Sequence, residues 1–164
     1  MNTTDNLEQF LPILRTASIF SGMSDSEILS VLHCMGAFVS DKEKDSYLLR
    51  AGDMTSTMGL LLSGSAIVIQ EDVWGHRNIM AQILPGQTFA EPFAASNGTA
   101  LNISVVVTKD CSLLYLDIHR ILGVCPSACE HHTHLIQNLI SVLAKKLLLL
   151  SLIHISEPTR PISI

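Results

Sequence analysis

Basic residues are few in this 164-residue chain, and they are scattered along it. Ten Lys and Arg stand against fifteen Asp and Glu, which gives a formal net charge of −5. A surface that binds nucleic acid normally gathers Lys and Arg on one face or along one helix. The charge pattern therefore predicts that this chain does not bind DNA by itself.

Cysteine pairs of the CxxC type are also absent. The four cysteines stand at positions 34, 111, 125 and 129. The first residues, MNTTDN, are polar and lack the apolar segment of a secretory signal. We therefore expect a cytoplasmic protein whose thiols are reduced.

Long apolar runs are missing as well. The longest stretch, near the C-terminus, is divided by Lys145 and Lys146. Each flank has about ten residues or fewer, whereas a helix needs about 20 to cross a bilayer. We therefore expect no membrane partner. Apolar residues still make up 48% of the chain, which is enough for the core of one domain.

Helical periodicity is present near the N-terminus. Residues 6–20 have apolar side chains at helical spacing, and Pro12 is expected to break or kink that helix. A second helix is predicted from Ser24. The Ser24 side chain can cap it, and Glu27 stands three residues further on, as in a capping box.

Between about residues 37 and 117 the pattern changes to short β-type runs. Glycines at 52, 64, 75 and 86 separate them at intervals of 11 or 12 residues, which indicates an antiparallel barrel or sandwich. The segment WGHR at 74–77 is typical of a hairpin turn. The runs are YLLRAG, MGLLLSG, SAIVIQED, NIMAQIL, ISVVV and SLLYLD.

Helical periodicity returns after residue 117. A long helix is predicted to begin at Pro126, with Cys125 at its cap. Its apolar residues then repeat with 4-3-4-3 spacing, which is a heptad pattern. Such a helix can pack on its own barrel or pair with a second copy, and the length of the stripe favours a homodimer. The predicted interface is Ile136, Ile140, Leu143, Leu147 and Leu150.

The last segment, SLIHISEPTRPISI, fits neither pattern and resembles cloning or sequencing-adapter sequence. We expect the natural protein to be longer. The predicted organisation is a barrel with N-terminal helices over 1–124, a dimerisation helix over 125–150 and a non-native tail over 151–164.

Four segments together resemble the sensor half of the Crp/Fnr family of transcription regulators, over about residues 5–150. The resemblance implies a mainly β fold with flanking helices, namely a cyclic-nucleotide-binding-like jelly-roll β-barrel followed by a long C-terminal dimerisation helix. It also implies a regulator and not an enzyme, with DNA bound only through a helix-turn-helix domain that this chain lacks. The segments are LLRAGD (48–53), GLLLSGSAIVI (59–69), ILPGQTFAEPFA (83–94) and SVVVTKDCSLLYLD (104–117).

The resemblance also implies the position of an effector pocket. Relatives that bind cyclic AMP carry F-G-E in this loop and an Arg about ten residues later, which pairs with the phosphate. Here Ala90 replaces the glycine, and the position of the Arg falls on Leu101 or Asn102. From Asn78 to His119 the sole basic residue is Lys109. The implied pocket residues are Phe89, Ala90, Glu91, Pro92, Phe93, Leu101, Asn102 and Ile103.

The missing guanidinium predicts that cyclic AMP does not bind. A charge-assisted hydrogen bond contributes about 1.5–3 kcal/mol, and Glu91 would face the phosphate unopposed at a cost of several kcal/mol more. Together these terms weaken binding by about three orders of magnitude or more. Two alternatives remain. The effector is an unknown neutral or apolar molecule that donates to Glu91, or the pocket has collapsed and the barrel is a structural scaffold.

Cys125, Cys129 and His132 share one helical face, which is compatible with a metal or redox role. Packing at the helix seam is the favoured interpretation, so we predict no metal site and no cofactor. A cupin-like metalloenzyme would need histidines inside barrel strands. None of the histidines falls in a predicted strand.

Overall fold

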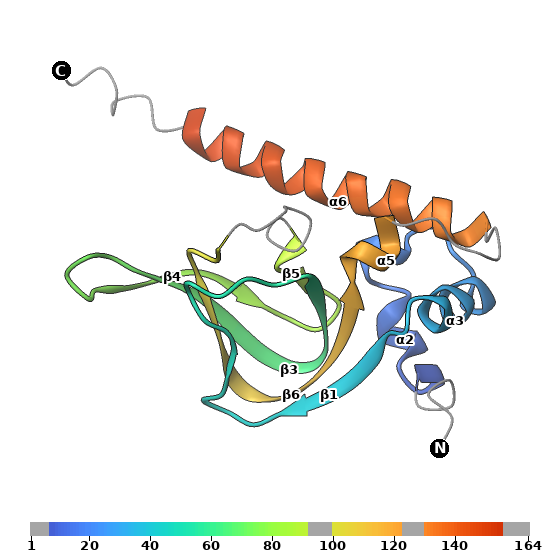
Figure 1. Ribbon diagram of the computed structural model, residues 1–164, viewed down its shortest axis with the longest axis horizontal. Coiled ribbons are helices and arrows are strands. Elements are labelled where there is room, and N and C mark those ends of the chain that lie inside the picture. The colour runs from blue at the N-terminus through green and yellow to red at the C-terminus, as the bar shows by residue number, and fades with distance from the viewer. Residues whose placement is uncertain (1–6, 92–99, 123–129, 156–164) are drawn as a thin grey trace.

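The computed structural model describes residues 7–91, 100–122 and 130–155 (Figure 1). Within these ranges an antiparallel sheet is flanked by helices, as the sequence predicted. In chain order the elements are α2 (Leu11–Leu14), η1 (Ser18–Phe20), α3 (Asp25–Cys34), β1 (Phe38–Lys42), β2 (Tyr47–Leu49), β3 (Thr57–Glu71), β4 (Arg77–Ile83), β5 (Thr88–Phe89), β6 (Ser104–Asp117), α5 (Ile118–Leu122) and α6 (Glu130–Ile155).

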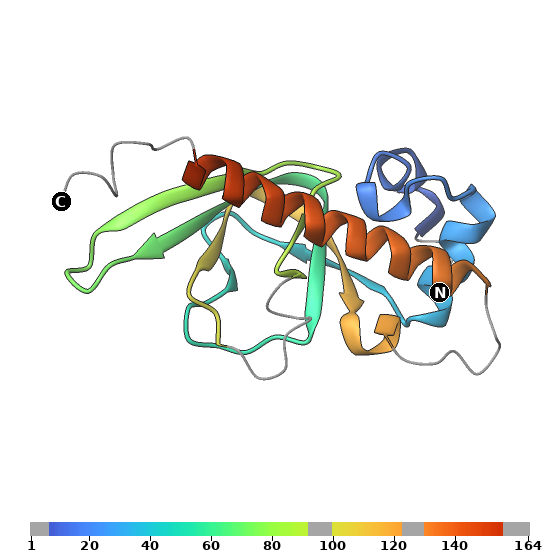
Figure 2. The ribbon, with the colours of Figure 1, turned by 90° about the horizontal axis from the view of Figure 1, so that it is seen from above.

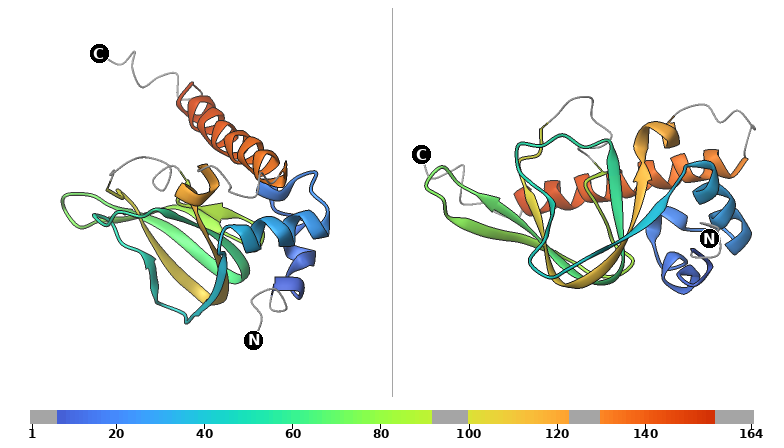
Figure 3. Two further views of the ribbon diagram at one scale, coloured as in Figure 1. Left: turned by 45° about the vertical axis from the view of Figure 1, so that its right-hand side comes forward. Right: turned by 60° about the horizontal axis from the view of Figure 1, so that its bottom comes forward.

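The sheet is built around the two longest strands, β3 and β6. The strand order is β1-β6-β3-β4, with β2 also paired to β6 and β5 to β3. Figure 3 shows these two strands curling along their length, so that the sheet folds over on itself. The predicted runs MGLLLSG and SAIVIQED therefore belong to one long strand, β3. The runs ISVVV and SLLYLD likewise belong to one long strand, β6. At Gly64, with φ +85°, the register shifts inside β3 instead of the chain turning back.

The hairpin between β3 and β4 confirms the predicted turn. Gly75 has φ +82°, and the Asp72 carboxylate accepts from the backbone N–H groups of Trp74 and His76, at 2.9 and 2.8 Å. An Asp that binds the backbone ahead of it stabilises such turns.

The N-terminal region forms less helix than expected. The helix predicted over 6–20 is broken into short pieces, namely a helical stretch at 7–8, α2 and η1, with Pro12 in the first turn of α2. The capped helix is confirmed as α3. Its Ser24 Oγ accepts from the N–H of Glu27 at 3.3 Å.

Two clusters of buried apolar residues divide the interior. One lies inside the barrel and includes Leu61, Ile83 and Val105. The other joins the N-terminal helices to the end of the sheet and includes Leu135 and Leu139 of α6. Figure 2 shows α6 running along one side of the molecule, from α3 and α5 past β5. The long helix is therefore packed on its own domain over part of its length.

The bounds of α6 differ from the prediction at its end. The predicted start at Pro126, with Cys125, lies outside the described residues. The helix does not stop at residue 150 but continues to Ile155. The heptad pattern ends near 150, yet no Pro or Gly interrupts the chain before Pro158. Among the helices of the described ranges, none combines the length and apolarity needed to cross a bilayer.

Candidate functional site

Glu91 is the buried charged side chain of the described residues, at 1% exposure. Strand β5 brings it there, because Phe89 pairs with Gly59 and Thr88 with Leu60 of β3. The chain then turns at Ala90, whose φ is +71°. The turn places the Glu91 carboxylate beside α6.

The left-handed conformation at Ala90 explains why a glycine suits this position. A residue with a Cβ loses about 1–2 kcal/mol in this region relative to its ordinary conformation, whereas glycine adopts it freely. Ala90 therefore carries local strain within the candidate site.

Ala90→Gly is expected to raise the free energy of unfolding by about 0.5–1 kcal/mol, since relief of strain exceeds the entropy cost of glycine. Urea denaturation measures the change. The matched control is Ala66→Gly, at a buried strand position without a positive φ, which should lose stability. Equal losses in both variants would contradict strain at Ala90.

The partner of Glu91 is Lys146 of α6. The Lys146 Nζ donates to Oε1 and Oε2 of Glu91 at 2.7 and 2.8 Å, and to the carbonyl oxygen of Thr88 at 3.0 Å. The Lys146 side chain is 42% exposed, so its stem reaches inward from solvent. All three ammonium protons and both carboxylate oxygens are thereby engaged.

This pair corrects the expectation that Glu91 is unopposed. Residues 78–119 hold Lys109 as their one Lys or Arg, whereas Lys146 is 55 positions from Glu91 in sequence. The spacing of the buried residues in α6 does indicate that Lys146 faces the domain. Leu135, Leu139 and Val142 form the buried face of α6, and Lys146 is the next position at the same spacing.

The other predicted pocket residues occupy different environments. Phe89 and Ala90 are buried in the barrel cluster, and Ile103 packs against it. Leu101 is 3% exposed and exchanges backbone hydrogen bonds with the 52–53 turn at 2.8 Å, while Asn102 is exposed. Pro92 and Phe93 lie outside the described residues.

The predicted heptad residues do not form the face that packs on the domain. Ile136 and Leu143 are half-buried at its edge. Ile140 and Leu147 are 60% and 67% exposed. The helix therefore presents an apolar strip to solvent, which also includes Leu148. Of Leu150 only the helical backbone is described.

The predicted cysteine and histidine cluster receives no structural test. Cys125 and Cys129 lie outside the described ranges, as does the side chain of His132. In the part of the chain that is described, no three His, Cys, Asp or Glu side chains are placed to hold a metal. All seven histidines lie in helices or at a turn, and none lies in a strand.

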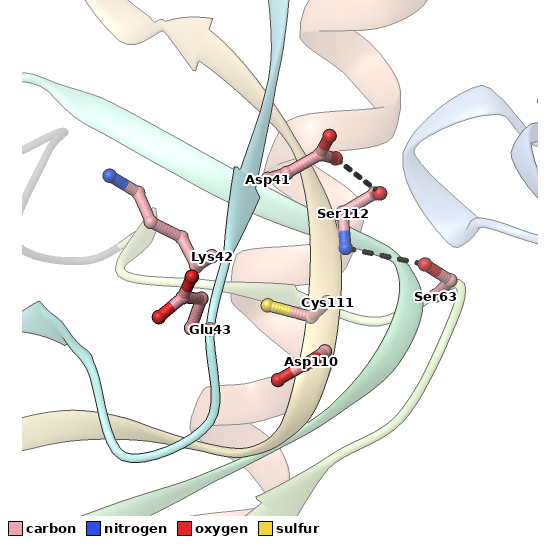
Figure 4. A pocket seen from close by; sticks show the side chains of 7 residues that line it. All are labelled: Asp41, Lys42, Glu43, Ser63, Asp110, Cys111 and Ser112. Atoms are coloured by element: carbon pink, nitrogen blue, oxygen red, sulfur yellow. Dashed lines mark hydrogen bonds between the residues drawn. The ribbon is translucent and has the colours of Figure 1, made fainter.

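A shallow cavity of about 360 Å³ lies over β1 and β6 around Cys111 (Figure 4). Ser112 Oγ donates to Asp41 at 2.6 Å, and the N–H of Lys44 donates to Asp110 at 2.7 Å. Burial, followed by the neighbouring carboxylates, raises the pKa of the Cys111 thiol. The Asp41 and Asp110 carboxylates are held by these hydrogen bonds, and we assign this cavity no ligand.

Comparison with known proteins gives a family and a fold. A family model described as the cyclic nucleotide-binding domain matches residues 41–127. The catabolite activator protein of Thermus thermophilus is similar with a TM-score of 0.71 and 20% identity, over 83% of this chain and 61% of that one. The chain thus spans about three fifths of that protein's length. No curated protein sequence matches.

Two other solved structures are similar over most of the chain. The sensor domain of the transcriptional regulator DNR from Pseudomonas aeruginosa has a TM-score of 0.60 and 16% identity, over 100% of this chain and 97% of that one. The regulatory subunit of a cAMP-independent protein kinase A from Trypanosoma brucei has a TM-score of 0.66 and 20% identity, over 88% and 47%. These likenesses confirm the predicted jelly-roll fold.

Proposed function

Since the chain belongs to the cyclic nucleotide-binding domain family, we propose that it is the effector-sensing and dimerisation domain of a Crp/Fnr-type transcription regulator that does not respond to cyclic AMP. The fold is typical of regulatory, non-catalytic proteins. Similarity to a catabolite activator protein and to a regulator's sensor domain supports this role. In this proposal DNA is bound by a separate helix-turn-helix domain.

The observation that carries the proposal is the pairing of Glu91 with Lys146. In relatives that bind cyclic AMP, the matching glutamate accepts from the ribose and an Arg neutralises the phosphate. Here both oxygens of Glu91 are engaged by Lys146, whose remaining proton goes to Thr88. A phosphate would therefore enter beside a buried carboxylate whose cationic partner, Lys146, is already engaged, at a cost of several kcal/mol.

Calorimetric titration with cyclic AMP and cyclic GMP tests the proposal. We expect a dissociation constant weaker than about 1 mM for both. Adenosine is the matched probe because it keeps the base and ribose without the phosphate, and it should bind no more weakly than cyclic AMP. Micromolar binding of either cyclic nucleotide would overturn the proposal.

The exposed strip of α6 supports the dimerisation role. Burying one leucine contributes about 1.5–3 kcal/mol, so Leu147→Glu should weaken the dimer by at least about tenfold. Sedimentation equilibrium measures the effect, with the exposed Lys145→Glu as the control on the same turn of the helix. A wild type that remains monomeric, or equal effects of the two variants, would contradict dimerisation through this strip.

A ligand-free structural barrel is the second candidate. It is supported by the burial of Phe89, Ala90 and Leu101, which leaves these side chains engaged in packing. Native mass spectrometry of the purified protein distinguishes the two, because a sensor isolated from cells can retain its ligand whereas a scaffold holds none.

A further inference from the structure

The two halves of α6 are held to the domain in different ways. The first half is anchored by the buried side chains of Leu135, Leu139 and Val142. Asn138 adds two hydrogen bonds of 2.9 Å to the carbonyl oxygens of Ile19 and Ser21. Apolar burial and hydrogen bonds together fix this part of the helix.

The second half has one described anchor. After the half-buried Leu143, the side chains of Ala144, Lys145, Leu147 and Leu148 are exposed. Lys146 alone among the described side chains 144–148 reaches back to the domain. The helical backbone then continues to Ile155. Within the described part of the chain, this half therefore depends on the contact with Glu91.

The acceptors around the Lys146 Nζ match one chemical group. Three oxygens surround it, at 2.7, 2.8 and 3.0 Å. A primary ammonium supplies three donors and satisfies all of them, whereas a hydroxyl supplies one and leaves two acceptors without a partner. Each buried acceptor left unsatisfied costs about 1–3 kcal/mol.

We propose that Glu91 and the Thr88 carbonyl form an ammonium-binding site that the chain fills with its own Lys146, and that an effector carrying a primary amine displaces it and releases residues 144–155 of α6. This inference rests on the proposed function, because the ammonium-binding site lies in the same effector pocket. The pair acts as a latch: the amine and Lys146 cannot both occupy the site, so amine binding and helix docking oppose each other.

Hydrogen–deuterium exchange tests the latch. Lys146→Met keeps an apolar stem and removes the ammonium, and Lys145→Met is the control one position away. We expect the rise in exchange over 144–155 in Lys146→Met to be about tenfold or more larger than any rise over 135–142 and the barrel strands, with no change in the control. Glu91→Gln should act like Lys146→Met while keeping the shape of the side chain.

A rise in exchange over the whole barrel as large as the rise over 144–155 would overturn the latch, because the pair would then stabilise the domain as one unit. Equal exchange in the Lys146 and Lys145 variants would also overturn it.

The wild type with n-butylammonium tests the ligand class. This primary amine should speed exchange over 144–155, whereas tetramethylammonium, which has the same charge and no N–H donor, should not. Equal effects of the two cations, or no effect of either, would overturn the ammonium assignment. Micromolar binding of cyclic AMP together with the expected exchange pattern would refute the proposed function and leave the latch intact.

Discussion

Replacing Lys146 with alanine is expected to lower the free energy of unfolding by about 3 kcal/mol. The carboxylate of Glu91, which is 1% exposed, would lose its counter-ion. The Thr88 carbonyl oxygen would lose the same donor. Removing one partner of a buried pair costs about 3–5 kcal/mol. The lower end applies here because Lys146 is 42% exposed and water can enter the vacated space. Urea denaturation measures the loss.

Two further variants separate the pair from a general charge effect. Lys145→Ala removes an exposed cation from the same helix and should change stability by no more than about 0.5 kcal/mol. Combining Lys146→Met with Glu91→Leu removes both charges and should recover most of the loss. Additive losses in the double variant would contradict a direct pairing.

Gly59→Ala is expected to cost about 2–3 kcal/mol. The ring of Phe89 lies against Gly59 of β3, and a Cβ at this position would overlap the ring. The ring would have to leave the barrel cluster, and β5 would move with it, which displaces the segment that carries Glu91. Glycine is required here by the close approach of a side chain and not by its backbone conformation.

A double-mutant cycle tests this contact. Phe89→Ala alone should cost about 3–5 kcal/mol through the lost burial. With the ring absent, Gly59→Ala has nothing to overlap, so the double variant should be no less stable than Phe89→Ala. Fully additive losses would show that the glycine matters for another reason.

Local patterns in the sequence predicted the local features well. The Ser24 cap, the turn at Gly75 and the β character of residues 37–117 all depend on residues within a few positions of each other. The same patterns failed where strands are long. Glycine normally marks the end of a run, but at Gly64 a register shift keeps β3 continuous to Glu71.

The site was predicted less completely, because its decisive contact joins segments far apart in sequence. The loop pattern predicts Phe89 and Glu91 as pocket residues, whereas in the sequence Lys146 only interrupts an apolar run. Its role depends on which face of α6 packs on the domain. The heptad pattern indicated Ile140 and Leu147, but the packed face carries Leu139 and Val142. Lys146 lies on this packed face, next to β5.

The most direct test of the account is the NMR signal of the Lys146 ammonium protons in the wild-type domain. Protons held by Glu91 and Thr88 should exchange slowly with water and give an observable signal, unlike those of exposed Lys145. The signal should disappear in Glu91→Gln and remain unchanged in excess cyclic AMP. An ammonium that exchanges as fast as that of Lys145, or one that cyclic AMP displaces, would contradict the account.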